Sequence, residues 1–148
     1  MRRVRAAILR VHVGLLALVI PDLAKRLRIA RLLALFTPRG PTALYAGFTT
    51  DEIVRVVERR LRRPWRMRRR PCLRRGLLLF YFLRLAGEPA VLHFCVYRET
   101  IVNSSFGHEQ AHCWVTIAGR CIASPPENEH VVILVHGEGR PYGHRAAA

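Results

Sequence analysis

Apolar residues recur at helical spacing through the first part of the chain. Residues 4–20 and 22–36 each predict a basic amphipathic helix, and we expect Pro21 to separate the two because proline interrupts helical hydrogen bonding. The run Thr37–Pro41 contains two prolines and a glycine and ends this pair. The pair is either a helical cover packed on the rest of the chain, which we favour, or a surface for an acidic partner or an anionic lipid.

A second apolar stripe predicts a helix that begins after Thr49. Thr49 and Glu52 have the spacing of a capping box, in which each side chain accepts a hydrogen bond from the other residue's backbone. The stripe that follows comprises Ile53, Val56, Val57 and Leu61. The helix then runs into a cluster of arginines that contains Arg62 and Arg63 and is interrupted at Trp65. These residues either bind an anionic substrate or partner, or form a solvated connector whose arginine stems cover apolar surface.

An unbroken apolar segment predicts a buried helix between Pro71 and Gly87. Proline is favoured at a helix start, and Gly87 can end the helix in the left-handed conformation. Cys72 therefore falls in the first turn, where unpaired backbone N–H groups and the helix dipole stabilise a thiolate, and Arg74 and Arg75 add positive charge. Cys72 is either such a nucleophile or a small core residue.

The pattern changes to short strand-like runs after Gly87. Runs rich in Val, Leu, Ile and aromatic residues predict strands at 90–97, 111–117, 120–123 and 131–135. The polar stretch 98–110 predicts a loop, and Ala118-Gly119 predicts a turn. The whole chain therefore predicts an α+β fold, in which a helical first half precedes a small antiparallel sheet.

Strand alternation gives the segment 111–117 two different faces. His112, Trp114 and Thr116 share one face, and the residues between them share the other. One face can therefore carry chemistry while the other packs. A cysteine on a helix followed by a histidine on a strand is the order used by papain-like and transglutaminase-like enzymes, in which the histidine serves the thiolate as a base.

The formal net charge of +15 is concentrated in the first half of the chain. Residues 1–70 contain 18 Lys and Arg against 4 Asp and Glu, whereas residues 71–148 contain 7 against 6. This balance raises nucleic-acid binding as a competing function, but aromatic residues interleave the arginine cluster only at Trp65, so we expect no nucleic-acid partner. Apolar residues make up 51% of the chain, which is enough for a packed core and excludes wholesale disorder.

The cysteine spacing and the N-terminus predict a cytoplasmic protein. The four cysteines, Cys72, Cys95, Cys113 and Cys121, have no framework spacing and predict reduced thiols. The apolar run Val11–Ile20 is too short to span a bilayer and is followed by no signal-peptidase site, although a weak contact with a membrane surface stays open.

Several histidines and cysteines could either bind a metal ion or pack as ordinary core and loop residues. The candidate ligands are His93, Cys95, His108, His112, Cys113 and Cys121. The pair His108 and His112 could bind zinc only on a helix, whereas 111–117 predicts a strand, and the chain has no Cys-x-x-Cys pair. We therefore expect no metal and no cofactor.

Three local motifs sharpen this picture. Cys72-Leu73 opens the apolar helix, Gly87–His93 has the form Gly-x-Pro-Ala-x-Leu-His, and Ala111–Trp114 has the form Ala-His-x-Trp before a glycine turn. Together these motifs closely resemble those of the leader peptidases of lasso-peptide biosynthesis, the small transglutaminase-like B proteins. The resemblance covers roughly residues 64–124 and extends less specifically to the basic helical N-terminal half.

The resemblance implies the domain organisation and the catalytic residues. It implies a transglutaminase-like or papain-like cysteine protease core at 64–136, a basic helical N-terminal region at 1–63 and a flexible tail at 137–148. Cys72 would be the nucleophile and His112 the general base. The family's third, acidic member falls near Ser124, so the chain departs from the pattern, and either Glu127 or Asn128 curls back to orient the histidine, or Ser124 or a water serves.

The same resemblance implies removal of the leader from the precursor of a ribosomally made, post-translationally modified peptide. The chain is similar in size to the split form that lacks a leader-recognition domain. The implied partners are the precursor peptide, a separate leader-recognition protein and the lasso cyclase, with Arg62, Arg63, Trp65 and Trp114 as candidate contacts. The alternative is a basic protein that binds nucleic acid or another partner and carries an inactive transglutaminase-like fold.

Overall fold

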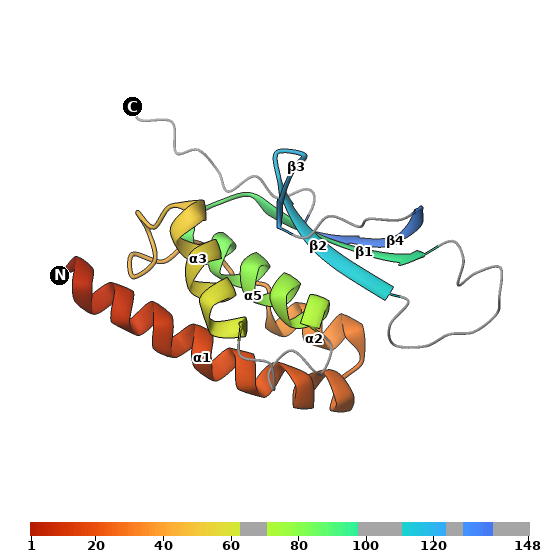
Figure 1. Ribbon diagram of the computed structural model, residues 1–148, viewed down its shortest axis with the longest axis horizontal. Helices are drawn as coiled ribbons and strands as arrows, with labels where there is room; N and C mark the ends of the chain where they lie inside the picture. Colours follow the sequence, from red (N-terminus) through yellow and green to blue (C-terminus); the bar gives the residue numbers. More distant parts are fainter. Residues whose placement is uncertain (63–70, 98–110, 124–128, 138–148) are drawn as a thin grey trace.

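The chain folds into a layer of helices on one face of an antiparallel sheet (Figure 1). The computed structural model describes residues 1–62, 71–97, 111–123 and 129–137. The helices within these residues are α1 (Arg2–Arg26), α2 (Ile29–Leu35), α3 (Thr50–Leu61) and α5 (Pro71–Ala86). The strands are β1 (Ala90–Tyr97), β2 (Ala111–Ile117), β3 (Arg120–Ala123) and β4 (His130–His136), in the sheet order β3-β2-β1-β4. The predicted α+β class is therefore confirmed.

Helix α1 continues through Pro21, so the prediction that this proline separates two helices was wrong. Pro21 is buried together with Ile20, although a proline inside a helix removes one backbone hydrogen bond, clashes with the preceding turn and costs about 3 kcal/mol. The chain instead leaves the helix at Leu27 and Arg28, whose backbones are extended, with ψ of 144° and 148°. Packing of the proline ring has outweighed its local preference.

Helix α1 has a buried face and an exposed apolar face. Leu9, Val13 and Ala17 are almost fully buried, on the side where α1 packs against α3 and α5. The exposed apolar residues on α1 are Val4, Ile8, Val11, Leu15, Leu18 and Val19. By length and composition alone, α1 is long and apolar enough to cross a membrane. The core helix of a soluble protein and a signal sequence meet the same criteria. The expectation that its apolar run is too short therefore does not hold, because the helix extends that run at its N-terminal end.

The predicted capping box is present at the start of α3. The Glu52 backbone N–H donates to Thr49 Oγ1 at 3.2 Å, and the Thr49 backbone N–H donates to the Glu52 carboxylate at 2.9 Å. The two bonds satisfy donors that a helix start otherwise leaves without partners. They fix where α3 begins, and its buried residues Ile53, Val57 and Leu61 face the rest of the helical layer.

Helix α5 is the central element of the domain. In Figure 1 it lies between the sheet and α1, and it contacts α1, α3, β1 and β2. Its middle residues, including Leu77, Leu78 and Phe80, are fully buried. The helix begins at Pro71 as predicted, and Gly87 follows it with a φ of 99°, the left-handed conformation expected for a terminating glycine. The hydrophobic core contains side chains from before and after residue 63. The domain boundary that we predicted between residues 63 and 64 stays a prediction.

The four strands lie at the segments that the sequence predicted. β1 and β2 pair antiparallel with Cys95 opposite His112 and His93 opposite Trp114. The β2–β3 turn places Ala118 and Gly119 at φ of 49° and 77°, as a two-residue hairpin turn requires. β4 pairs with β1, and its residues 131–135 are all exposed. The predicted loop at 98–110 and tail at 138–148 lie outside the described residues.

Gly76 allows α5 to approach the sheet closely. A Cβ placed on Gly76 would lie 2.8 Å from Cys113 Sγ and 3.1 Å from Leu92 Cδ1. We therefore expect Gly76→Val to lower the free energy of unfolding by about 1–3 kcal/mol through overpacking, measured by urea denaturation. Ala30→Val on the exposed surface of α2 is the control and should cost about 0.5 kcal/mol or less. Equal losses in the two variants would show that the contact at Gly76 is unimportant.

Candidate active site

The first turn of α5 places Cys72 against the beginning of β2. The half-buried Cys72 Sγ lies 3.7 Å from the Ala111 carbonyl oxygen. The next two residues of β2, His112 and Cys113, are the groups whose interactions with the Cys72 sulfur lower the pKa of that thiol. The structure therefore brings together Cys72 and His112, the two residues that the sequence selected as nucleophile and base.

The second thiol, Cys113, is a contact that the sequence reasoning missed. Its side chain is 3% exposed and lies on the face of β2 that packs on α5, where alternation predicted a small packing residue. That position is correct, but the Cys113 thiol also lowers the pKa of Cys72. The sequence did contain a signal for this contact, because Cys113 directly follows His112. A strand that brings a histidine to the start of a helix also brings the next residue near the same helical turn.

These contacts give Cys72 an unusually acidic thiol. Hydrogen bonding to the Cys113 side chain, followed by the hydrogen bond and charge of His112, lowers the pKa of Cys72 to about 4, although partial burial opposes this shift. The same hydrogen bond and near-complete burial raise the pKa of Cys113 well above its ordinary value. Burial also raises the pKa of the thiols of Cys95 and Cys121. Cys72 is thus the one cysteine favoured as a thiolate at neutral pH.

The predicted contribution of Arg74 and Arg75 is not what lowers this pKa. Arg75 Nε lies 2.7 Å from Glu58 Oε1, so this guanidinium is directed to α3. Arg74 is buried, with 5% of its surface exposed. The groups that lower the pKa of Cys72 lie on β2 instead. The sequence predicted both arginines near the Cys72 thiol because they lie two and three residues after it. In the folded chain, Arg75 instead forms an ion pair with Glu58 of α3.

A column of aromatic rings holds His112. The His112 ring stacks on Trp114 with centroids 6.4 Å apart, and Trp114 stacks on His93 at 5.1 Å. His93 Nε2 is in turn 2.8 Å from Thr116 Oγ1, which anchors the far end of the column. The shared face that strand alternation predicted for His112, Trp114 and Thr116 is confirmed. The stack restrains the imidazole plane, as a positioned base requires.

Several predicted site residues lie outside the described residues. These are Arg63, Trp65, His108, Ser124, Glu127 and Asn128, so the third catalytic member stays a prediction. Arg62 is exposed directly after α3, and Trp114 is 9% exposed within the ring column. Among the described residues, no cluster of three or more His, Cys, Asp or Glu side chains could hold a metal ion.

The site joins a thiol with a low pKa at a helix start to a histidine on the neighbouring strand. A family model described as the transglutaminase-like superfamily matches residues 14–135. The chain belongs to the transglutaminase-like superfamily. This superfamily includes cysteine peptidases, and the match extends from within α1 to within β4, across both Cys72 and His112. No curated protein and no solved structure matches the chain significantly.

Removing the second thiol tests its effect on Cys72. We expect Cys113→Ala to raise the pKa of Cys72 by about 1–2 units, because the thiolate loses a hydrogen bond that stabilises it. The measurement is the pH dependence of iodoacetamide labelling at Cys72, followed by mass spectrometry. Cys121→Ala on β3 is the control and should leave the profile unchanged. An unshifted profile in Cys113→Ala would show that the second thiol does not stabilise the first.

Proposed function

We propose that this protein is a cysteine peptidase that removes the leader from a lasso-peptide precursor, in the split form that works with a separate leader-recognition protein. The observation that carries the proposal is the contact of Cys72 with His112 at the start of α5. Three motifs around these residues favour the lasso leader peptidases over other members of the superfamily. They are Cys72-Leu73, Gly87–His93 and Ala111–Trp114.

The proposed reaction begins with the Cys72 thiolate. Its sulfur attacks the carbonyl carbon at the leader–core junction and forms a C–S bond, and the oxyanion accepts hydrogen bonds from backbone N–H groups at the start of α5. The C–N bond then breaks while the His112 imidazolium gives a proton to the departing core amine. Water, deprotonated by His112, attacks the acyl group, the C–S bond breaks, and the leader leaves with a free carboxylate.

Two exposed apolar surfaces support a function that depends on partners. One is the exposed face of α1, where Val4, Ile8 and Val11 continue a helical stripe. The other is β4, whose residues 131–135 are exposed on the strand at the end of the sheet order. Surfaces of this kind mark contacts with other proteins. The leader-recognition protein and the lasso cyclase, acting in the cytoplasm, are the proposed occupants.

Cleavage of a lasso precursor peptide tests the proposal. We expect a single cut, at the leader–core junction, that is accelerated by the leader-recognition protein and detected by liquid chromatography and mass spectrometry. Incubation with a labelled primary amine is the control that distinguishes hydrolysis from acyl transfer. A transferase of the same superfamily would join the amine to the acyl group. Amine incorporation without hydrolysis, or no cut with the partner present, would contradict the peptidase.

A further inference from the structure

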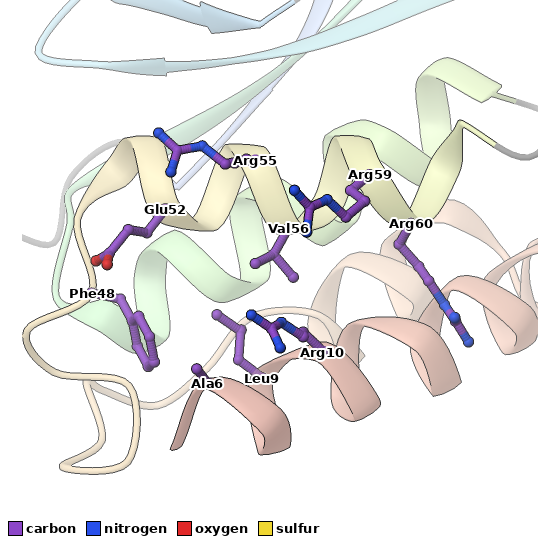
Figure 2. Close-up of a pocket in the computed structure, with 9 residues that line it drawn as sticks. All are labelled: Ala6, Leu9, Arg10, Phe48, Glu52, Arg55, Val56, Arg59 and Arg60. Atoms are coloured by element: carbon purple, nitrogen blue, oxygen red, sulfur yellow. The ribbon is translucent and has the colours of Figure 1, made fainter. Parts of the chain in front are cut away.

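A groove about 480 Å³ in volume lies between α1 and α3, in the helical layer (Figure 2). Its apolar lining consists of Ala6, Leu9, Phe48 and Val56. Its charged lining consists of Arg10, Arg55, Arg59, Arg60 and Glu52. Figure 2 shows Val56 and Leu9 directed toward each other between the two helices, and Arg60 reaching from α3 to α1. The groove therefore combines an apolar base with arginines from both helices.

The one carboxylate in this lining is already engaged. Glu52 accepts the backbone N–H of Thr49 and lies 2.7 Å from the Arg2 guanidinium. The hydrogen bond from Thr49, supported by Arg2, lowers the pKa of Glu52 and keeps it ionised. Its charge is thus directed toward the start of α3 and α1, and Glu52 does not pair with the arginines of the groove.

The groove arginines have no carboxylate partner in the described part of the chain, where the ion pairs are those of Arg2 and Arg75. Arg60 packs so closely over α1 that a Cβ on Gly14 would lie 2.7 Å from its guanidinium. The Nε of Arg60 is also buried without a hydrogen-bond partner. Guanidinium groups that line a groove without a carboxylate partner attract anions, and a carboxylate ligand matches their hydrogen-bond donors.

We propose that this groove binds an acidic segment of the leader peptide, with carboxylates on Arg10 and Arg59 and an apolar side chain against Val56. That the peptide is a leader rests on the proposed function. That the peptide is acidic and carries an apolar side chain rests on the arginines and apolar residues that line the groove. The apolar base favours a peptide over nucleic acid, whose binding is dominated by phosphate contacts. The concave shape favours a side chain over a membrane surface.

The groove is linked to the nucleophile through α3. Glu58, beside Arg59 on α3, forms the ion pair with Arg75, which lies one turn after Cys72 on α5. Helix α3 thus lines the groove with one face and holds the nucleophile helix with another. A peptide anchored in the groove is held on the element that packs against the catalytic helix, which raises its effective concentration at Cys72.

Binding of a defined probe tests the proposal. The probe is a fluorescein-labelled peptide in which glutamates flank a pair of leucines, measured by fluorescence anisotropy against the full-length Cys72→Ala chain. We expect Arg10→Glu with Arg59→Glu to weaken binding about 10-fold or more, because two attractive contacts become repulsive. Arg31→Glu with Arg39→Glu makes the same charge change at two exposed residues outside the groove, and should weaken binding less than about 3-fold.

Several outcomes would overturn the groove as an acidic-peptide site. One is equal weakening in the two double variants, and another is undiminished binding of the probe with glutamine in place of glutamate. A third is tighter binding of a single-stranded oligonucleotide that is lost in the groove variant. Thermal melts followed by circular dichroism confirm folding, and Arg10→Gln with Arg59→Gln serves as a milder variant if the reversal unfolds.

Cleavage assays keep this inference separate from the proposed function. If the groove variant binds weakly and the wild type cuts no precursor, the peptide site stands and the leader peptidase fails. If precursor cleavage by an otherwise wild-type chain is unaffected by Arg10→Glu with Arg59→Glu, the peptidase stands and the groove is not the leader site.

Discussion

Replacing Cys72 with alanine is expected to lower the rate of precursor cleavage by about 10⁴-fold or more, because the proposed reaction then has no nucleophile. Cys72 is half-buried in the first turn of α5, so the variant should keep its fold. The rate is measured from the amount of core peptide formed with the leader-recognition protein present. The structure offers no other thiol with a lowered pKa to replace Cys72.

A matched control separates chemistry from packing. Cys121→Ala removes a partly buried thiol from β3 and should cleave at the wild-type rate. Trapping adds a direct test, since the wild type should form a thioester with the leader that mass spectrometry detects, whereas Cys72→Ala should not. Cleavage by Cys72→Ala at more than a small fraction of the wild-type rate would show that the reaction uses another nucleophile.

Loss of the His112 imidazole is expected to have the next largest effect. We expect His112→Gly to lower the cleavage rate by about 10²–10⁴-fold, because the proposed reaction then has no base and no proton donor. The pKa of Cys72 should also rise, because the hydrogen bond and charge of His112 help to lower it. The two effects are measured by steady-state cleavage and by alkylation across a pH range.

Rescue with free imidazole distinguishes this role from a structural one. Glycine leaves a space beside Trp114 that an added imidazole can occupy, since the native ring stacks there with a 6.4 Å centroid separation. Partial recovery of cleavage in His112→Gly, with no effect on the wild type, is the expected result. An unchanged Cys72 pKa in this variant would contradict the assigned contact.

The features predicted well from the sequence are those that local physics determines. The capping box at Thr49, the start of α5 at Pro71 and the turn at Gly119 depend on residues close together in the chain. Strand alternation likewise placed His112 and Trp114 on one face. Local rules therefore located both the helix that begins next to Cys72 and the strand that carries His112.

The features that were missed depend on contacts between distant parts of the chain. Pro21 lies inside α1 and is buried there, and a local rule does not take such burial into account. The hydrogen bond between Cys72 and Cys113 depends on how closely α5 approaches β2 at Gly76. The arginine groove requires α1 to pack on α3, and the periodicity of each helix alone did not predict that pairing.

Contacts from β2 hold Cys72 as a thiolate, and the pH dependence of alkylation at Cys72 measures this. The wild-type protein is labelled with iodoacetamide across a pH range, and the rate at each cysteine is measured by mass spectrometry. With a pKa of about 4, Cys72 should be labelled at half its maximal rate near that pH and stay reactive at higher pH, while the other three thiols react only in alkali. A Cys72 profile that rises near the ordinary thiol pKa of 9.0 would contradict the account.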